Sequence, residues 1–148
     1  MPNNFSLKEQ IALLEKNGQL PALEESDSVL CTNINNNGVR DDIEAFITRL
    51  QLPEKKARAA LQKAKAIQLN LSVDTNDKAA LQRVGETGIA SCNCLFYSIP
   101  DGQIANQLSR AIESKTPNTK IGATKYLAYN SSRSGSVTTL PVDDTCEK

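Results

Sequence analysis

The sequence predicts an all-α fold, an irregular bundle of five to six helices with a loop-rich C-terminal tail that a disulfide pins to the bundle. Apolar residues recur every three to four positions over most of the chain, and only residues 136–140 have an extended pattern. Clusters of Pro, Gly, Asn and Asp separate the helical stretches. The length of 148 residues fits one domain. We divide it into an N-terminal helix with a loose lead-in (1–30), a helical core (31–130) and the tail (131–148).

Two short helices are expected in the first third of the chain. Ser6 and Glu9 form a capping box that opens the first helix, and Gly18 ends it. Residues 19–30 are acidic and irregular. The second helix follows an asparagine-rich loop and stops before Pro53. Its predicted core-facing residues are Ile43, Phe46, Ile47 and Leu50.

A third helix has Pro53 in its first turn and carries two distinct faces. One face is an apolar stripe typical of close helix packing, made by Ala57, Ala60, Leu61, Ala64, Ile67 and Leu71. The other face is basic and consists of Lys55, Lys56, Arg58, Lys63 and Lys65. Because no aromatic residues interleave with these cations, we interpret the basic face as solvated and not as a nucleic-acid surface.

Three further helices are expected in the second half of the chain. The longest covers residues 76–98, and its two glycines either admit a close neighbour or mark a kink. A Pro-Asp-Gly turn separates it from a helix over residues 103–114. The last helix begins at residue 118 or 119 and runs through Tyr129. We expect Tyr126 and Tyr129 to form hydrogen bonds at the rim of the core.

The four cysteines are Cys31, Cys92, Cys94 and Cys146. Cys92 and Cys94 lie in an expected helix, where residues two apart point to different faces and do not bridge easily. Two pairings remain, Cys31–Cys92 with Cys94–Cys146 or Cys31–Cys94 with Cys92–Cys146. Either pairing ties the asparagine-rich loop and the tail to the fourth helix. Because disulfides persist in oxidising compartments, we expect a periplasmic or secreted protein.

Composition argues against several classes of function. The 17 basic and 17 acidic residues balance, so bulk charge attracts neither nucleic acid nor anionic membrane. No apolar run has the length of a transmembrane helix, and the first ten residues lack a signal-peptide pattern, so we expect the signal peptide to be missing from this sequence. The chain has no histidine, which removes histidine-based catalytic triads and metal centres.

Residues 33–44 match the ligand spacing of an EF-hand calcium loop when Gly38 takes position 6. The predicted metal ligands at positions 1, 3, 5, 7, 9 and 12 are then Asn33, Asn35, Asn37, the Val39 carbonyl, Asp41 and Glu44. Only two of them are carboxylates, which predicts weak binding, with a dissociation constant of roughly 10⁻⁴ to 10⁻³ M. Arg40 departs from the pattern, because EF-hands usually carry an aliphatic residue there for pairing with a second loop. This sequence contains no second loop.

The same residues also fit an ordinary capped turn. In that interpretation Asp41 is the N-cap of the second helix and Glu44 completes a capping box at N3. The asparagines and Gly38 then form local turns, since both residue types tolerate positive φ. The two interpretations share one structure and differ in whether calcium occupies it.

Several segments carry a resemblance to a protein group. The run NINNNGVRDDIEAFI at 33–47 is followed by Cys94-Leu95-Phe96, by Asn118-Thr119 with residues 125–129, and by Leu140-Pro141 with Asp144-Thr145-Cys146. In this order the chain resembles a group of uncharacterised exported bacterial proteins and lipoproteins, in which a D-x-N-x-N-G-x-R-D-D-x-E/D core begins a helical domain. The resemblance covers about residues 30 to 148 and implies export and a helical fold, without an activity. The group usually has aspartate where this chain has Asn33.

Three functions are consistent with the sequence. The first is a non-enzymatic periplasmic or secreted module that binds another protein, such as an immunity or inhibitor protein for a bacterial toxin. The second is a structural protein of the cell envelope that weakly bound Ca²⁺ stabilises. The third is a hydrolase that works without histidine. We expect a protein partner, no nucleic acid and no cofactor other than Ca²⁺.

Overall fold

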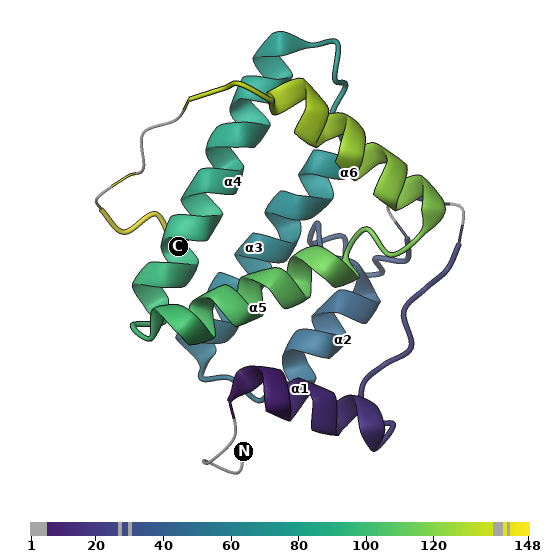
Figure 1. Cartoon of the computed structure of the whole chain (residues 1–148), viewed down its shortest axis with the longest axis vertical. Helices are drawn as coiled ribbons and strands as arrows, with labels where there is room; N and C mark the ends of the chain where they lie inside the picture. Colours follow the sequence, from purple (N-terminus) through teal and green to yellow (C-terminus); the bar gives the residue numbers. More distant parts are fainter. Residues whose placement is uncertain (1–5, 27, 30, 138–140, 142) are drawn as a thin grey trace.

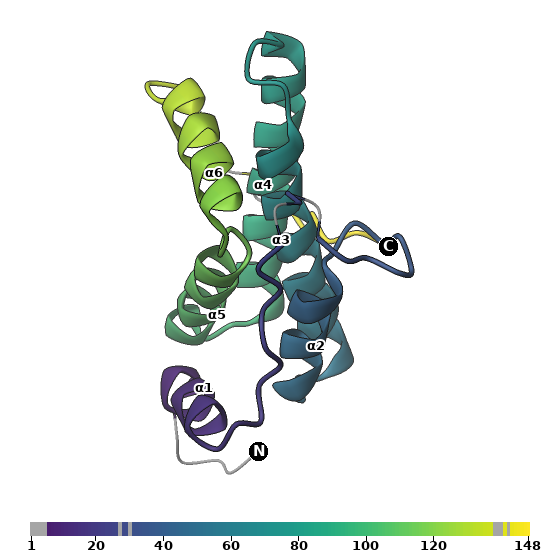
Figure 2. The ribbon, with the colours of Figure 1, turned by 90° about the vertical axis from the view of Figure 1, so that its right-hand side faces the viewer.

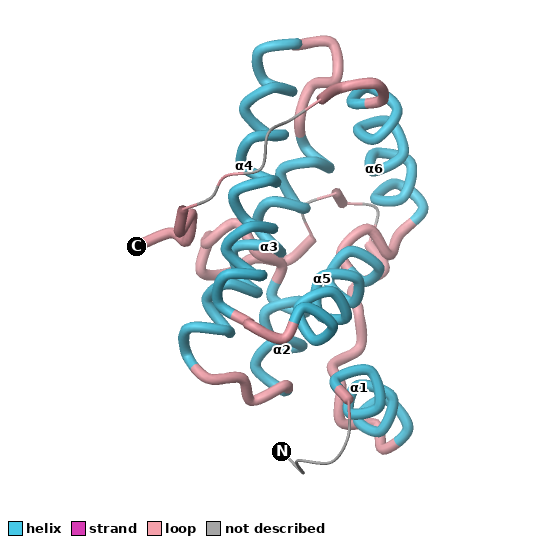
Figure 3. Tube along the Cα trace, turned by 60° about the vertical axis from the view of Figure 1, so that its left-hand side comes forward, coloured by secondary structure: helices cyan, strands magenta, loops and turns pink. Residues whose placement is uncertain are grey.

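The computed structural model describes residues 6–26, 28–29, 31–137, 141 and 143–148. Its described residues form six α-helices and no strand, which confirms the all-α prediction (Figures 1 and 3). The helices are α1 (Leu7–Lys16), α2 (Asp41–Arg49), α3 (Glu54–Ser72), α4 (Lys78–Ser98), α5 (Gly102–Lys115) and α6 (Lys120–Arg133). No helix in the described part of the chain is long and apolar enough to cross a membrane.

Side chains cap four of the helices at their N-termini. Ser6 and Glu9 form the predicted capping box of α1. Asp77, Asp101 and Thr119 accept hydrogen bonds from the first-turn amides of α4, α5 and α6. Helix α6 runs four residues further than predicted and ends at Arg133. Of the extended segment expected at 136–140, residues 136 and 137 are not in a strand, and 138–140 lie outside the described residues.

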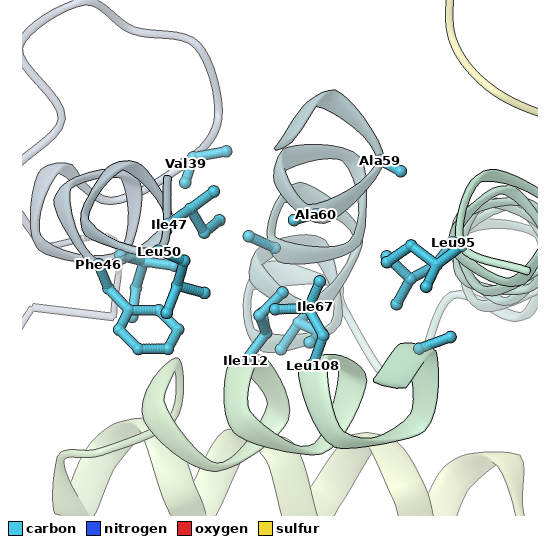
Figure 4. Close-up of a cluster of buried hydrophobic side chains, with 14 of the residues drawn as sticks. Val39, Phe46, Ile47, Leu50, Ala59, Ala60, Ile67, Leu95, Leu108 and Ile112 are labelled. Carbon is cyan, nitrogen blue, oxygen red and sulfur yellow. The ribbon is translucent and has the colours of Figure 1, made fainter. Parts of the chain in front are cut away.

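The core lies between α2, α3, α4 and α5 (Figure 4). The four core residues predicted for the second helix are buried. In the predicted stripe of α3, Ala60, Ala64, Ile67 and Leu71 are buried, and Ala57 and Leu61 are partly buried. Leu95 from α4 and Leu108 and Ile112 from α5 complete the cluster. The alanines let neighbouring elements approach α3 closely, as the sequence predicted.

Helices α3 and α4 are the longest pair and pack side by side along the molecule (Figure 1). Helices α5 and α6 lie on one side of this pair, and α1 packs against α5 at one end. The loop that precedes α2 and the C-terminal tail lie together on the opposite side (Figure 2). The fold therefore leaves one side of α3 to two irregular segments that are far apart in sequence.

The basic face of α3 is only partly solvated, contrary to the sequence prediction. Lys63 is buried, and its amine lies 3.1 Å from the Glu113 carboxylate of α5. Lys65 pairs with Glu147 of the tail at 3.5 Å. The charge pattern of a single helix cannot show that α5 and the tail lie against this face and supply the carboxylates.

Candidate metal centre

The residues predicted to bind calcium form one closed loop before and within the first turn of α2. The Asp41 amide donates to the Thr32 carbonyl at 2.8 Å and closes the loop at its base. The main chain turns through positive φ at Asn36 and at Gly38, where φ is 83°. Such a backbone favours Asn and Gly, so the residue types expected for the turn occupy the positions that require them.

Three of the predicted ligands organise the loop interior through their side-chain oxygens. The Asn37 amide donates to Asn33 Oδ1 and to Asn35 Oδ1, each at 3.3 Å. The Val39 amide donates to Asn37 Oδ1 at 3.0 Å. The Val39 side chain is buried in the core, which fixes the main chain whose carbonyl is the predicted ligand at position 7. The amide oxygens thus point into one small turn, as a loop that wraps a cation requires.

The carboxylate of Glu44 faces the same turn. Asn35 Nδ2 donates to Glu44 Oε2 and Asn37 Nδ2 donates to Glu44 Oε1, both at 3.2 Å. The arrangement therefore brings position 12 into contact with positions 3 and 5.

Asp41 does not cap α2, so the predicted capping box of Asp41 and Glu44 is wrong. Helix α2 already includes Asp41, and its N-cap residue Arg40 makes no side-chain capping bond. The Asp41 carboxylate instead accepts the Ile34 amide at 3.2 Å, across the loop. Both acidic residues therefore accept hydrogen bonds from the loop and do not cap the helix end.

The charge at the loop is low. Asp42, the nearest further carboxylate, is committed to Arg40, so only Asp41 and Glu44 face the turn. No group of three or more Asp, Glu, His or Cys side chains that could hold a metal occurs among the described residues. The donor set of amide, main-chain and two carboxylate oxygens fits a hard cation such as Ca²⁺ and predicts weak binding.

A polar cluster around the buried Arg40 side chain holds the base of the loop, and we call it the loop joint. Its members are Glu24, Thr32, Arg40, Asp42, Thr116 and Asn118. Arg40 is only 2 % exposed and forms a two-pronged pair with the Asp42 carboxylate. Its Nη1 also donates to the Thr116 carbonyl and, at 2.6 Å, to Asn118 Oδ1. The guanidinium thereby ties α2 to the connection between α5 and α6.

Glu24 joins the other end of the loop to this cluster. Its carboxylate accepts the Thr32 amide at 2.6 Å, and its own amide donates to Asp42 Oδ2 at 2.7 Å. Its carbonyl accepts Arg40 Nη2 and Asn118 Nδ2. The hydrogen bond from the Thr32 amide is the main reason that the pKa of Glu24 lies below its usual value.

A second cluster, which we call the tail joint, fixes the C-terminal tail to α3 and α4. It consists of Gln62, Ala90, Asn93, Cys94, Thr145 and Cys146. Cys94 and Cys146 form a disulfide bond. Thr145 Oγ1 donates to the Ala90 carbonyl at 2.6 Å and accepts Asn93 Nδ2 at 3.0 Å. The tail is therefore held by the disulfide of Cys146 and by the hydrogen bonds of the neighbouring Thr145.

Of the two expected disulfide pairings, the structure excludes Cys31–Cys94 with Cys92–Cys146, because Cys94 is bonded to Cys146. The Cys31–Cys92 bridge of the other pairing is not formed, and both thiols are free. Cys92 lies two helical turns after Gly85, on the α4 face that Arg133 approaches.

The Cys31 thiol donates to the Ser28 carbonyl at 3.3 Å, and burial raises its pKa. The loop was expected to sit against α4 but packs on α3, where the side chain of Lys65 lies over Gly38. The loop does not need α4, because the loop joint anchors this segment without any bond to that helix.

A groove of about 840 Å³ lies between the calcium-type loop, α3 and the tail. Its floor includes Val39, Ala59 and Leu61, and its flanks carry Lys55 and Arg58. The Lys55 amine also lies 5.2 Å from the centroid of the Tyr97 ring. The groove adjoins the predicted metal site through Asn37 and Val39, and the sequence pattern did not indicate it because the distant tail forms one of its walls.

No protein family, no curated protein and no solved structure matches this chain.

Proposed function

We propose that this protein is a calcium-binding helical domain of the periplasm or the extracellular space, in which Ca²⁺ at residues 33–44 stiffens the loop against α3. The observation that carries the proposal is the internal order of the loop. Residues at positions 1, 3, 5, 9 and 12 of an EF-hand spacing make hydrogen bonds within one turn, although they come from both the loop and α2.

Calcium would be held by the side-chain oxygens of Asn33, Asn35, Asn37 and Glu44, by the Val39 carbonyl and by Asp41. The metal would supply positive charge to a turn in which two carboxylates lie close together, and it would replace weak amide contacts with ion–oxygen bonds. Its role is structural, because it stiffens the loop against α3. The disulfide supports an oxidising compartment, where calcium is abundant enough for a weak site.

Thermal unfolding with calcium and with EDTA tests the proposal. About 5 mM calcium, roughly ten times the expected dissociation constant, should stabilise the fold by about 1.4 kcal/mol. This gain corresponds to a rise of about 4.5 °C in the midpoint. Asn33→Asp adds the missing carboxylate and should enlarge the shift, whereas Glu44→Gln should abolish it. An identical midpoint in calcium and in EDTA for both the wild type and Asn33→Asp would end the calcium proposal.

A second candidate function is binding of an acidic segment of another protein in the groove. The cations of its lining support it: Lys55, Arg58, Lys65 and Lys148 surround an apolar floor, against the three carboxylates of Glu54, Asp144 and Glu147. An immunity or inhibitor protein for a bacterial toxin is one form that such a module takes. This hypothesis predicts a stoichiometric complex that the double variant Lys55→Glu/Arg58→Glu loses and the matched variant Lys120→Glu/Lys125→Glu on α6 keeps. A complex that survives the first variant would refute binding in the groove.

A further inference from the structure

The loop joint ties both ends of the calcium-type loop to the same main-chain segment. At the N-terminal end, the Glu24 carboxylate accepts both the amide and the hydroxyl of Thr32, which immediately precedes the loop. At the C-terminal end, Arg40 and Asp42 contact the carbonyl and the amide of Glu24. Residue 24 is therefore a common anchor for the two ends of a loop that begins at position 33.

The Arg40 side of this anchor is desolvated and paired, whereas the hydrogen bonds between Glu24 and Thr32 are exposed. Arg40 is nearly fully buried, and its guanidinium donates to a carboxylate, to two main-chain carbonyls and to the amide oxygen of Asn118. Asn118 in turn donates to the Glu24 carbonyl at 3.0 Å. A buried charge with every partner in place resists displacement, since any movement leaves polar groups unpaired.

EF-hand loops usually occur in pairs, and an aliphatic residue at position 8 makes the contact between the two loops. Here position 8 is Arg40, and its side chain turns away from the loop into the loop joint. We propose that Arg40, clamped by Glu24 and Asn118, is a positioning residue that holds a single calcium loop in its binding conformation in place of a second loop. This inference rests on the proposed calcium site.

The variant that tests it best is Asn118→Ala, because the Asn118 side chain contacts Arg40 and Glu24, neither of which is a predicted calcium ligand. If the loop joint holds the loop, the variant lowers the population of the binding-competent conformation. The apparent dissociation constant rises by the same factor, about tenfold if one loop in ten stays competent. Arg40→Lys should have a larger effect, since lysine cannot reproduce the planar fork.

Asp101→Ala is the matched control. It removes the N-cap of α5, where Asp101 accepts two amides, and so destabilises the fold without touching the loop joint. Calcium titration by calorimetry should give the wild-type dissociation constant for this variant. Equal weakening in Asp101→Ala and Asn118→Ala would overturn the inference, because general destabilisation would then explain both.

Amide hydrogen exchange in metal-free protein gives a readout that does not depend on calcium. The Val39 and Asp41 amides donate within the loop and at its base, and both should exchange faster in Asn118→Ala while core amides of α3 keep their rates. Unchanged calcium affinity or unchanged exchange at these amides would overturn the positioning role. If the wild type binds no calcium but the exchange result holds, the proposed function fails while the organising role of Arg40 stands.

Discussion

The loop joint and the tail joint each fix an irregular segment to the helical bundle, but they do so through different interactions. The tail joint attaches the C-terminal tail to α3 and α4, and the loop joint attaches the loop before α2 to the connection between α5 and α6. Both segments lie on the side of α3 opposite α5 and α6 (Figure 2). The tail joint uses a disulfide, whereas the loop joint uses a buried arginine and forms no covalent bond. A disulfide holds two segments together even when nearby hydrogen bonds are lost, whereas a buried charge becomes destabilising when one of its partners is removed. The loop joint should therefore fail through any one member and the tail joint only through the disulfide.

Removal of the disulfide should have the largest effect on stability. The bridge closes a loop with a sequence separation of 52 residues, and Cys94→Ala/Cys146→Ala should cost about 4 kcal/mol, mainly by freeing the unfolded chain. Urea unfolding measures this difference. Limited proteolysis should also cut the variant near residue 143, because hydrogen bonds alone hold the released tail.

Alkylation of unreduced native protein provides the control for the disulfide prediction. Cys31 and Cys92 should be labelled on unfolding without reductant, and Cys94 and Cys146 only after reduction. Labelling of all four residues without reductant would contradict both the bridge and the oxidising compartment that it supports.

Arg40→Met should have the next largest effect, a loss of about 3 kcal/mol in the free energy of unfolding. The change leaves the Asp42 carboxylate buried without its cation and the Thr116 carbonyl without its donor. Arg58→Met on the exposed side of α3 is the matched control and should change stability by less than about 0.5 kcal/mol. A cost for Arg40→Met as small as that of the control would show that the loop joint contributes no more than a surface ion pair.

Residues whose environment depends on local periodicity were predictable from the sequence. Phe46 and Ile47 are buried as expected, because the spacing of apolar residues on a short helix determines which face the core covers. The calcium-type spacing was likewise visible, because all its residues lie within one short segment. Both features depend on residues that are close together in the sequence.

The joints were not predictable, because their partners are far apart in sequence. Arg40 was noted only as a departure from the EF-hand pattern, and nothing near it indicates that Asn118, 78 residues later, accepts its hydrogen bond. Lys63 was assigned to solvent for the same reason, since Glu113 arrives from another helix. The cysteines were paired by elimination, which assumed that every thiol is used, whereas Cys31 and Cys92 are free.

Thr145→Ala should have a smaller effect than either change above, about 1 kcal/mol. The hydroxyl links Ala90 and Asn93, but the adjacent disulfide keeps the tail in place when both hydrogen bonds are lost. In the background without the disulfide, the same substitution should detach the tail, which proteolysis near residue 143 would detect. Equal proteolytic protection of Thr145→Ala with and without the disulfide would contradict the division of roles within the tail joint.

Acid should loosen the loop joint before the tail joint, and this is the smallest expected effect. The Thr32 amide lowers the pKa of Glu24 in the folded state below the ordinary glutamate value of about 4.3. A depressed folded pKa means that the stabilising contribution is complete above the unfolded value and is lost as the pH falls through the folded one. Because Glu24 is solvent-accessible, the change should be local and leave the helices folded.

The Thr32 and Glu147 amide resonances, followed between about pH 6 and pH 3, separate the two joints. Thr32 should shift as Glu24 takes up its proton, and Glu24→Gln should remove that transition, because glutamine has nearly the same shape and no charge. The Glu147 amide donates to the neutral side chain of Gln62 and serves as the reference within the tail. If Thr32 titrates identically in Glu24→Gln, the carboxylate is not what holds the base of the loop, and the comparison between a covalent joint and a charge-dependent one no longer stands.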